Sequence, residues 1–275
     1  MKRAWVLLGL IVVLLAAVAT VGYAWAFPSQ GFHEIDSNIL DDWEICRTSA
    51  FGEDGYYQIT ETGFRPVIAF ESLGEQANVA YSLGEQIANE YPDTLQRAEV
   101  VFSFVRDRVQ YTSDIDSFGS EEFARNADEL ATTIAEDGSG EGDCEDMAVL
   151  LAVMYKAAGF RSAIMLLSEH TAVLVYLPEY NEATVFFELE GEPGWIWAEA
   201  TGRNNPLGWA PEQYLDMEIP AYEISAEGVA PLTPPPSTEI AFAGTGEGAA
   251  SPPYLFSIVI GLLWCLSLLR RISRR

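Results

Sequence analysis

The residue best placed for chemistry is Cys144, which stands where a glycine-rich segment meets an apolar helical pattern. Residues 138–142 read GSGEG and predict a flexible loop, and Asp143 is a natural N-cap for the helix that follows. Apolar residues then recur at helical spacing until Gly159 ends the pattern. A cysteine in the first turn of a helix faces the positive end of the helix dipole, which favours the thiolate, and the free backbone N–H groups there stabilise an oxyanion. We therefore interpret Cys144 as a nucleophile rather than as a small core residue.

A thiol nucleophile needs a proton acceptor, and the chain contains two histidines. His170 precedes a β-prone run at the predicted edge of a sheet, whereas His33 lies in a polar stretch near the N-terminus and is interpreted as solvated. Glu199 follows a tryptophan-rich run on a later strand of the same sheet, where it can accept the second N–H of the imidazole. The sequence thus predicts a catalytic triad of Cys144, His170 and Glu199, in which the helix dipole and the histidine have to outweigh the acids beside the cysteine. The alternatives are that His170 is an ordinary residue at the sheet edge and that Glu199 is an exposed, solvated carboxylate.

The elements that hold these residues in place are predicted from hydrophobic periodicity. Apolar residues at helical spacing predict helices at 79–90 and 94–109, the second one capped by Asp93. The cysteine helix comes next, and short β-prone runs follow it at 163–167, 171–177, 184–189 and 194–198. Residues 43–70 mix aromatics with glycine and threonine, which predicts short strands or irregular structure. This order of elements predicts an α+β fold in which an antiparallel sheet follows the helices.

Several runs of residues resemble the transglutaminase-like superfamily, and together they cover about residues 95–214. The run GDCEDMAVLL at 142–151, closed by AAGFR at 157–161, resembles the cysteine helix of that family. VRDRVQY at 105–111 is similar to the helix and tyrosine that commonly precede it, and WAEATG at 197–202 stands where an Asp-Pro-Thr run is usual. The resemblance implies a papain-like fold, whose members carry a cysteine, a histidine and an acid in that order along the chain.

Two departures from the family pattern stand out. The acid is Glu199 instead of an aspartate, and Thr171 and Ala172 follow His170 where an aromatic residue is common. A glutamate orients a histidine as well as an aspartate does, so the first departure leaves the implied chemistry intact. The acidic, membrane-anchored form is similar to archaeal transglutaminase-like proteins and, more distantly, to bacterial transglutaminase-like periplasmic cysteine proteinases, which share a Gly-Asp-Cys-x-Asp core.

Two uncharged apolar segments lie near the ends of the chain, at residues 4–27 and 254–269, and both adjoin lysine or arginine. We interpret each as a transmembrane helix whose basic flank, including the tail 270–275, faces the cytoplasm. The first segment alternatively reads as a cleaved signal peptide. In either case the intervening chain is expected outside the cytoplasm, and we divide it into an N-terminal extension at 28–92, a transglutaminase-like domain at 93–225 and a proline-rich linker at 226–253.

The composition excludes some classes of partner. A net charge of −26 argues against nucleic-acid binding. Three cysteines and two histidines are too few and too scattered for a disulfide scaffold or a structural zinc site. We assign no cofactor and no metal ligands, and the sequence does not decide whether the protein depends on a metal. Asp114 begins a run similar to a calcium-binding loop, but Phe118 and Arg125 occupy ligand positions, so we interpret the run as an ordinary loop. Cys46 is expected to be a buried or free thiol, although a disulfide to Cys144 would silence the site.

These features predict a membrane-tethered cysteine enzyme that attacks amide or peptide bonds of protein or peptide substrates in the cell envelope and forms a thioester. Hydrolysis and transfer to an amine are not distinguished by the sequence, and neither is the oligomeric state. Two alternatives remain open: a catalytically inactive binding module with the same fold, and a structural cell-surface protein whose C-terminal segment is a sorting signal.

Overall fold

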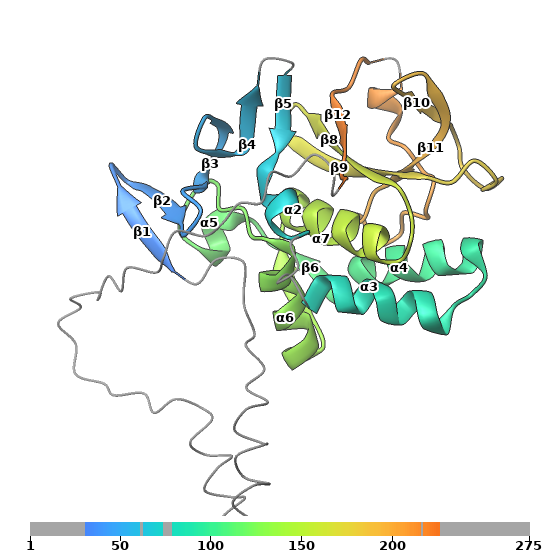
Figure 1. Ribbon diagram of the computed structural model, residues 1–275, viewed down its shortest axis with the longest axis horizontal. Helices are drawn as coiled ribbons and strands as arrows, with labels where there is room; N and C mark the ends of the chain where they lie inside the picture. Colours follow the sequence, from blue (N-terminus) through green and yellow to red (C-terminus); the bar gives the residue numbers. More distant parts are fainter. Residues whose placement is uncertain (1–30, 61–62, 74–78, 216, 226–275) are drawn as a thin grey trace, which may run out of the picture. The chain divides into compact units, whose positions relative to one another are not determined.

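The computed structural model describes residues 31–225, apart from 61–62, 74–78 and 216 (Figure 1). In this part of the chain no helix is both long and apolar enough to cross a membrane. The two segments predicted to span a membrane, 4–27 and 254–269, lie outside the described residues, as do the proline-rich linker and the basic tail. Helices and strands alternate in blocks along the described chain, which agrees with the predicted α+β class.

Five short strands form a first sheet, in which each strand neighbours the next along the chain. They are β1 (Phe32–Ile35), β2 (Asn38–Asp41), β3 (Cys46–Gly52), β4 (Gly55–Thr60) and β5 (Gly63–Pro66), and the short helix α2 (Val67–Glu71) follows. Neighbouring strands pair antiparallel except β3 and β4, which pair parallel with a register shift. The strands confirm the expectation for residues 43–70, whereas the sequence pattern does not predict α2.

Helices follow the first sheet and include the two predicted from periodicity. They are α3 (Val79–Glu90), α4 (Thr94–Arg108), the short α5 (Asp114–Ser117) and α6 (Ala127–Asp137). The bounds of α3 are those predicted, and the carboxylate of Asp93 caps α4 by accepting a 2.9 Å hydrogen bond from the backbone N–H of Gln96. Helix α6 begins at a capping box in which Asn126 and Glu129 exchange hydrogen bonds, a start signal that the sequence interpretation did not use.

Two loop predictions around the site are wrong. Helix α4 stops at Arg108 because Val109 begins the strand β6 (Val109–Tyr111), which pairs in parallel with β7 (Gly140–Gly142). The glycine-rich segment predicted to be a flexible loop is therefore held by a two-stranded ladder. The run that begins at Asp114, interpreted as a loop, contains the single turn α5 instead.

The cysteine helix α7 (Cys144–Ala157) lies at the centre of the described fold. It contacts α3, α4 and α6 on one side and the strands of a second sheet on the other (Figure 1). Nearly every residue from the second turn onward is buried, which is the pattern of a helix covered on all sides. Gly159, in the left-handed region at φ 87°, follows the end of the helix as predicted. The position of Cys144 is therefore fixed by a helix that has little freedom to move.

The second sheet is antiparallel throughout, with the strand order β10-β11-β9-β8-β12. Its strands are β8 (Ser162–Leu167), β9 (His170–Tyr176), β10 (Phe187–Leu189), β11 (Glu192–Ala198) and β12 (Ala221–Glu223), with a 3-10 turn η1 (Glu212–Tyr214) before the last. Alternate residues face opposite sides: Ile164, Val173 and Ile196 join the main core, whereas Trp195 and Trp197 join a second apolar cluster. Both faces of the sheet are thus covered.

His170 lies at the turn into its strand, as predicted. His170 is the first residue of β9, and β9 is the central strand of the second sheet. The residue lies at the end of that strand, beside the turn to β8, where it pairs with Leu167.

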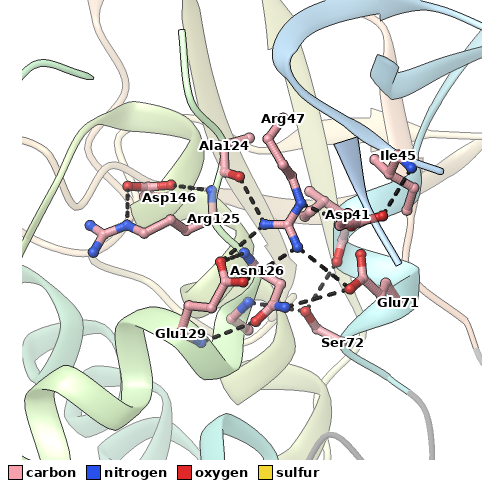
Figure 2. A network of polar contacts seen from close by, with 12 residues as sticks. Asp41, Ile45, Arg47, Glu71, Ser72, Ala124, Arg125, Asn126, Glu129 and Asp146 are labelled. Carbon is pink, nitrogen blue, oxygen red and sulfur yellow. Dashed lines mark hydrogen bonds and ion pairs between the residues drawn. The ribbon is translucent and has the colours of Figure 1, made fainter. Parts of the chain in front are cut away.

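A buried arginine anchors the first sheet to the helices (Figure 2). Arg47 in β3 is fully buried, and its Nε lies 2.9 Å from Asp41 Oδ2. Its Nη1 donates to Ala124 O and to Glu129 Oε2, both at 3.0 Å, and its Nη2 lies 3.6 Å from Glu71 Oε1. Burial alone would lower the pKa of Arg47, but the three carboxylates outweigh burial and raise it above its ordinary value. This network joins β2, β3 and α2 to the start of α6.

Candidate active site

Cys144 is held at the start of α7 because the backbone at Gly142 packs closely against two side chains. Gly142 pairs with Tyr111 across the β6–β7 ladder, two residues before the cysteine. A Cβ on Gly142 would lie 2.8 Å from Arg125 Nη2 and 2.9 Å from Asp146 Oδ2, so a larger residue does not fit here without a shift. The guanidinium of Arg125 and the buried carboxylate of Asp146 form a 2.9 Å ion pair against this glycine (Figure 2). The ladder and the ion pair together fix the direction in which the chain enters the helix.

Asp143 occupies the predicted N-cap position but does not cap the helix with its side chain. Its carboxyl group is hydrogen-bonded to Glu145 instead. Burial, together with the charge and the hydrogen bond of Glu145, raises the pKa of Asp143 to about 8.

The Cys144 thiol is partly exposed and has two polar partners. Its Sγ donates to Glu145 Oε2 over 3.2 Å, and the backbone N–H of Thr171 donates to the sulfur. Burial raises the pKa of the thiol, and the charges of Glu145 and Asp143 raise it further, in spite of the Thr171 N–H. The acids beside the cysteine therefore oppose the thiolate, as the sequence indicates, and in this arrangement they prevail.

His170 and Glu199 lie on adjacent strands and form a short contact. His170 begins β9, Glu199 follows β11, and His170 Nε2 lies 2.8 Å from Glu199 Oε2. The carboxylate is 3% exposed and also accepts hydrogen bonds from Trp197 Nε1 and from the Thr201 hydroxyl. Burial opposes its charge, but the contacts with His170, Thr201 and Trp197 outweigh burial and hold the pKa of Glu199 below its usual value. The interpretation of Glu199 as an exposed, solvated carboxylate is wrong.

An aromatic stack supports the imidazole from outside. The ring of Tyr214, in η1, lies nearly parallel to the His170 ring, at 6.3 Å between centroids and 12° between planes. The ring of Trp197 also lies nearly parallel to the Tyr214 ring, at 5.6 Å between centroids and 13° between planes. Tyr214 comes from the connection between β11 and β12 and carries no sequence signal of its own, so the sequence interpretation missed it.

The structure brings the three predicted site residues together. Cys144 and Glu199 line the same narrow cavity of about 10 Å³, with the start of β9 between them. Thr171 contacts the cysteine sulfur, and His170, one residue earlier, contacts Glu199. Within the described chain no hydrogen bond joins the sulfur to the imidazole, because the thiol is bonded to Glu145 instead. Cys46 is a free, buried thiol, and Cys144 is free as well, so the two do not form a disulfide.

A side chain of the first sheet also reaches the site. The buried hydroxyl of Tyr57 in β4 lies 3.0 Å from Thr171 Oγ1. Burial raises the pKa of Tyr57, the hydrogen bond with Thr171 partly offsets this effect, and the nearby Glu145 and Cys144 raise the pKa again. Residues more than one hundred positions apart thus meet beside the cysteine, a contact for which the sequence holds no local signal.

His33, interpreted as solvated, lies away from these residues. Its Nε2 is 3.3 Å from Glu44 Oε2, and its side chain is 28% exposed. It is therefore paired on the surface of the first sheet rather than freely hydrated.

The mixed fold, with a cysteine at the start of a central helix and an antiparallel sheet after it, is consistent with a transglutaminase-like core. The family model of the transglutaminase-like superfamily matches residues 81–209, a span that runs from α3 to beyond β11 and includes Cys144, His170 and Glu199. This match supports a cysteine-enzyme superfamily for that part of the chain. No curated protein matches the chain.

Proposed function

We propose that this protein is a membrane-tethered thiol enzyme that acts on amide or peptide bonds of envelope proteins or peptides. Cys144 is the nucleophile, His170 is the base and then the acid, and Glu199 orients the imidazole. The observation that carries the proposal is the 2.8 Å contact between His170 Nε2 and the buried Glu199, next to a residue that touches the cysteine sulfur. With Nε2 engaged by the carboxylate, Nδ1 is the nitrogen left for the thiol proton.

The proposed reaction follows thiol acyl chemistry. The thiol passes its proton to His170, and the thiolate attacks the carbonyl carbon of the amide. The oxyanion is stabilised by the backbone N–H of Cys144 at the positive end of α7. When the intermediate collapses, the amine leaves with the proton from His170, and a thioester remains on Cys144. Water or a second amine then loses a proton to His170 and attacks the thioester, which releases the acyl group and restores the thiol.

One movement has to precede this reaction. The thiol now donates to Glu145, so in the reactive arrangement it turns away from this carboxylate and toward the imidazole. Because the helix itself is held by its surroundings, the movement we propose is a rotation of the side chain about the Cα–Cβ bond. Glu145 thus competes with His170 for the thiol proton.

The proposed location rests on the ends of the chain. The uncharged segments 4–27 and 254–269 and their basic flanks favour a domain held at the outer face of the membrane, whether or not the first segment is cleaved. Such a tether limits the substrates to proteins or peptides of the cell envelope. The excess of acidic residues suits this location, and it argues against a nucleic-acid partner.

Selective alkylation of the full-length protein tests the nucleophile. We expect iodoacetamide to modify Cys144 faster than the buried Cys46, and we expect His170→Ala to slow the modification about tenfold or more, because the base is lost. Peptide mass spectrometry gives both rates in one sample. His33→Ala is the matched control and should change neither rate. Equal rates for Cys144 in the wild type and in His170→Ala would contradict the proposed pair.

A non-catalytic binding module is the second candidate. It is favoured by the hydrogen bond that keeps the thiol on Glu145 and by the narrowness of the cavity at Cys144. If this reading is right, Cys144→Ala and His170→Ala leave the cellular phenotype unchanged, whereas substitutions on the surface abolish it. If the protein is an enzyme, both alanine variants change the cellular phenotype as much as loss of the whole protein does.

A further inference from the structure

A tyrosine from outside the family-matched span enters the candidate active site. Tyr57 lies in β4, well before residue 81, where the match to the transglutaminase-like superfamily begins. The residue is 2% exposed, and its hydroxyl lies 3.0 Å from Oγ1 of Thr171, which is also buried. The contact therefore joins the first sheet to the start of β9.

Thr171 links this tyrosine to both groups of the proposed thiol chemistry. Its backbone N–H donates to the sulfur of Cys144, and it directly follows His170 in the chain. A shift of Thr171 would thus move the donor away from the sulfur and carry the imidazole with it. Residues that hold reacting groups in this indirect way decide how well a site is preorganised.

The start of β9 has little support from its own sheet. Strand β8 pairs with β9 from His170 to Val175, whereas the ladder with β11 runs from Val173 to Tyr176. Within the described residues, the backbone of 170–172 is therefore paired by β8 alone. The hydroxyl of Tyr57 gives this segment a second support, from a different sheet.

The tyrosine itself is firmly held. In β4, Tyr57 lies opposite Pro66 of β5, and its ring packs against those of Tyr56 and Phe51, at 4.6 Å and 5.8 Å between centroids. The first sheet is in turn tied to the helices by the buried ion pairs of Arg47. Tyr57 thus presents its hydroxyl from a rigid support, as a group that positions others must.

We propose that Tyr57 is a positioning residue of the thiol site. Its hydroxyl holds Thr171, so that the backbone N–H of Thr171 stays on the sulfur of Cys144 and His170 stays within reach of the thiol. This role rests on the proposed function, because it gives Tyr57 a part in that chemistry. It also makes the first sheet a working part of the enzyme, although that sheet lies outside the family-matched span.

Alkylation of Cys144 in the full-length protein in detergent tests the proposal. Tyr57→Phe keeps the ring and removes only the hydroxyl. We expect iodoacetamide to modify Cys144 about fivefold more slowly at neutral pH, since a loosely held N–H stabilises the thiolate less. For the same reason the rate profile, followed from about pH 6 to about pH 10, should move to higher pH.

A matched control separates positioning from a general loss of stability. Tyr155 is fully buried too, and its hydroxyl donates to the Ala98 carbonyl over 3.1 Å, between α7 and α4. Tyr155→Phe should lower the Tm about as much as Tyr57→Phe does, because each change removes one buried hydrogen bond. It should leave the rate and the pH profile of Cys144 alkylation unchanged.

Thr171 supplies a second set of variants, which removes the same bond from the other side. Thr171→Val loses the hydroxyl and should slow alkylation about as much as Tyr57→Phe, whereas Thr171→Ser keeps a hydroxyl and should be slowed less. Because both changes break one bond, the double variant Tyr57→Phe/Thr171→Val should be no slower than the slower single variant.

Three results would overturn the proposal: a wild-type rate and pH profile for Tyr57→Phe, equal slowing by Tyr57→Phe and Tyr155→Phe, or effects of Tyr57→Phe and Thr171→Val that multiply in the double variant. His170→Ala distinguishes this failure from that of the proposed function. If His170→Ala slows alkylation and Tyr57→Phe does not, the thiol enzyme stands and the positioning role falls. If His170→Ala reacts like the wild type, the proposed function falls and the positioning role falls with it.

Discussion

The contact between His170 and Glu199 depends on one buried negative charge. Glu199→Gln keeps the size of the side chain but removes the charge that holds the imidazole and stabilises its protonated form. We expect the rate of Cys144 alkylation to fall about tenfold to a hundredfold, with little change in exposure of the thiol. Glu188→Gln, an exposed glutamate of the neighbouring strand β10, is the control and should react like the wild type.

The same substitution predicts a dependence on pH. Since the folded protein holds the pKa of Glu199 below the ordinary value of 4.5, its ionisation stabilises the fold above that pH. This stabilisation is lost as the pH falls through the lowered pKa, where the carboxylate takes up a proton. The difference in Tm between the wild type and Glu199→Gln should therefore be largest near neutral pH and shrink at acidic pH. A difference that grows toward acid would show that the carboxylate is not held ionised.

At the level of elements, the start of α7 depends on the glycine before it. Gly142→Ala places a methyl group against the ion pair of Arg125 and Asp146, both of which are tied to neighbouring backbone. We expect a loss of about 1–3 kcal/mol, which lowers the Tm by about 3–10 °C in differential scanning calorimetry. Gly31→Ala is the control, because its added methyl group meets only the movable carboxylate of Asp42. An unchanged Tm for Gly142→Ala would mean that Gly142 does not pack closely against Arg125 and Asp146.

The elements that the sequence predicts well are those with a strong local pattern. Helix α3 has the predicted bounds, Asp93 caps α4, and α7 runs from the cysteine to just before Gly159. The strands after α7 also lie near their predicted positions, because β-prone residues and turns alternate there. By contrast β7 consists of glycine and glutamate, and its pairing with β6 is decided by residues thirty positions away. No local propensity predicts such a strand.

The residues of the candidate site also fall into those with a local sequence signal and those without one. Cys144 is visible in the sequence because a helix start is a local signal, and its partners His170 and Glu199 are inferred from the order of strands. Tyr57 is not found, because its contact with Thr171 arises only when distant segments pack together. The capping role given to Asp143 fails for a related reason, since Glu145 competes for its side chain.

At the level of the whole described fold, one buried cation joins the first sheet to the helices. Arg47 faces Asp41, Glu71 and Glu129, and Arg47→Met would leave these three carboxylates together without their guanidinium partner. Breaking a buried ion pair from one side costs about 3–5 kcal/mol, so we expect the Tm to fall by about 6–20 °C. Arg65→Met is the matched control: Arg65 is bonded to Gln58 near the surface, and its loss should cost little.

The dependence of the Tm on pH distinguishes the loss of the Arg47 ion pairs from a simple packing defect. Burial already raises the pKa of Glu71 well above its ordinary value, although Arg47 opposes the shift. In Arg47→Met this opposition is gone, so the folded variant takes up protons that the unfolded chain does not, and its stability rises as the pH falls. The Tm deficit of Arg47→Met should thus be smaller at about pH 5 than at pH 8, and adding Glu71→Gln should recover part of it at pH 8. A deficit that is independent of pH, and unchanged by Glu71→Gln, would mean that shape and not charge makes Arg47 the link between the first sheet and the helices.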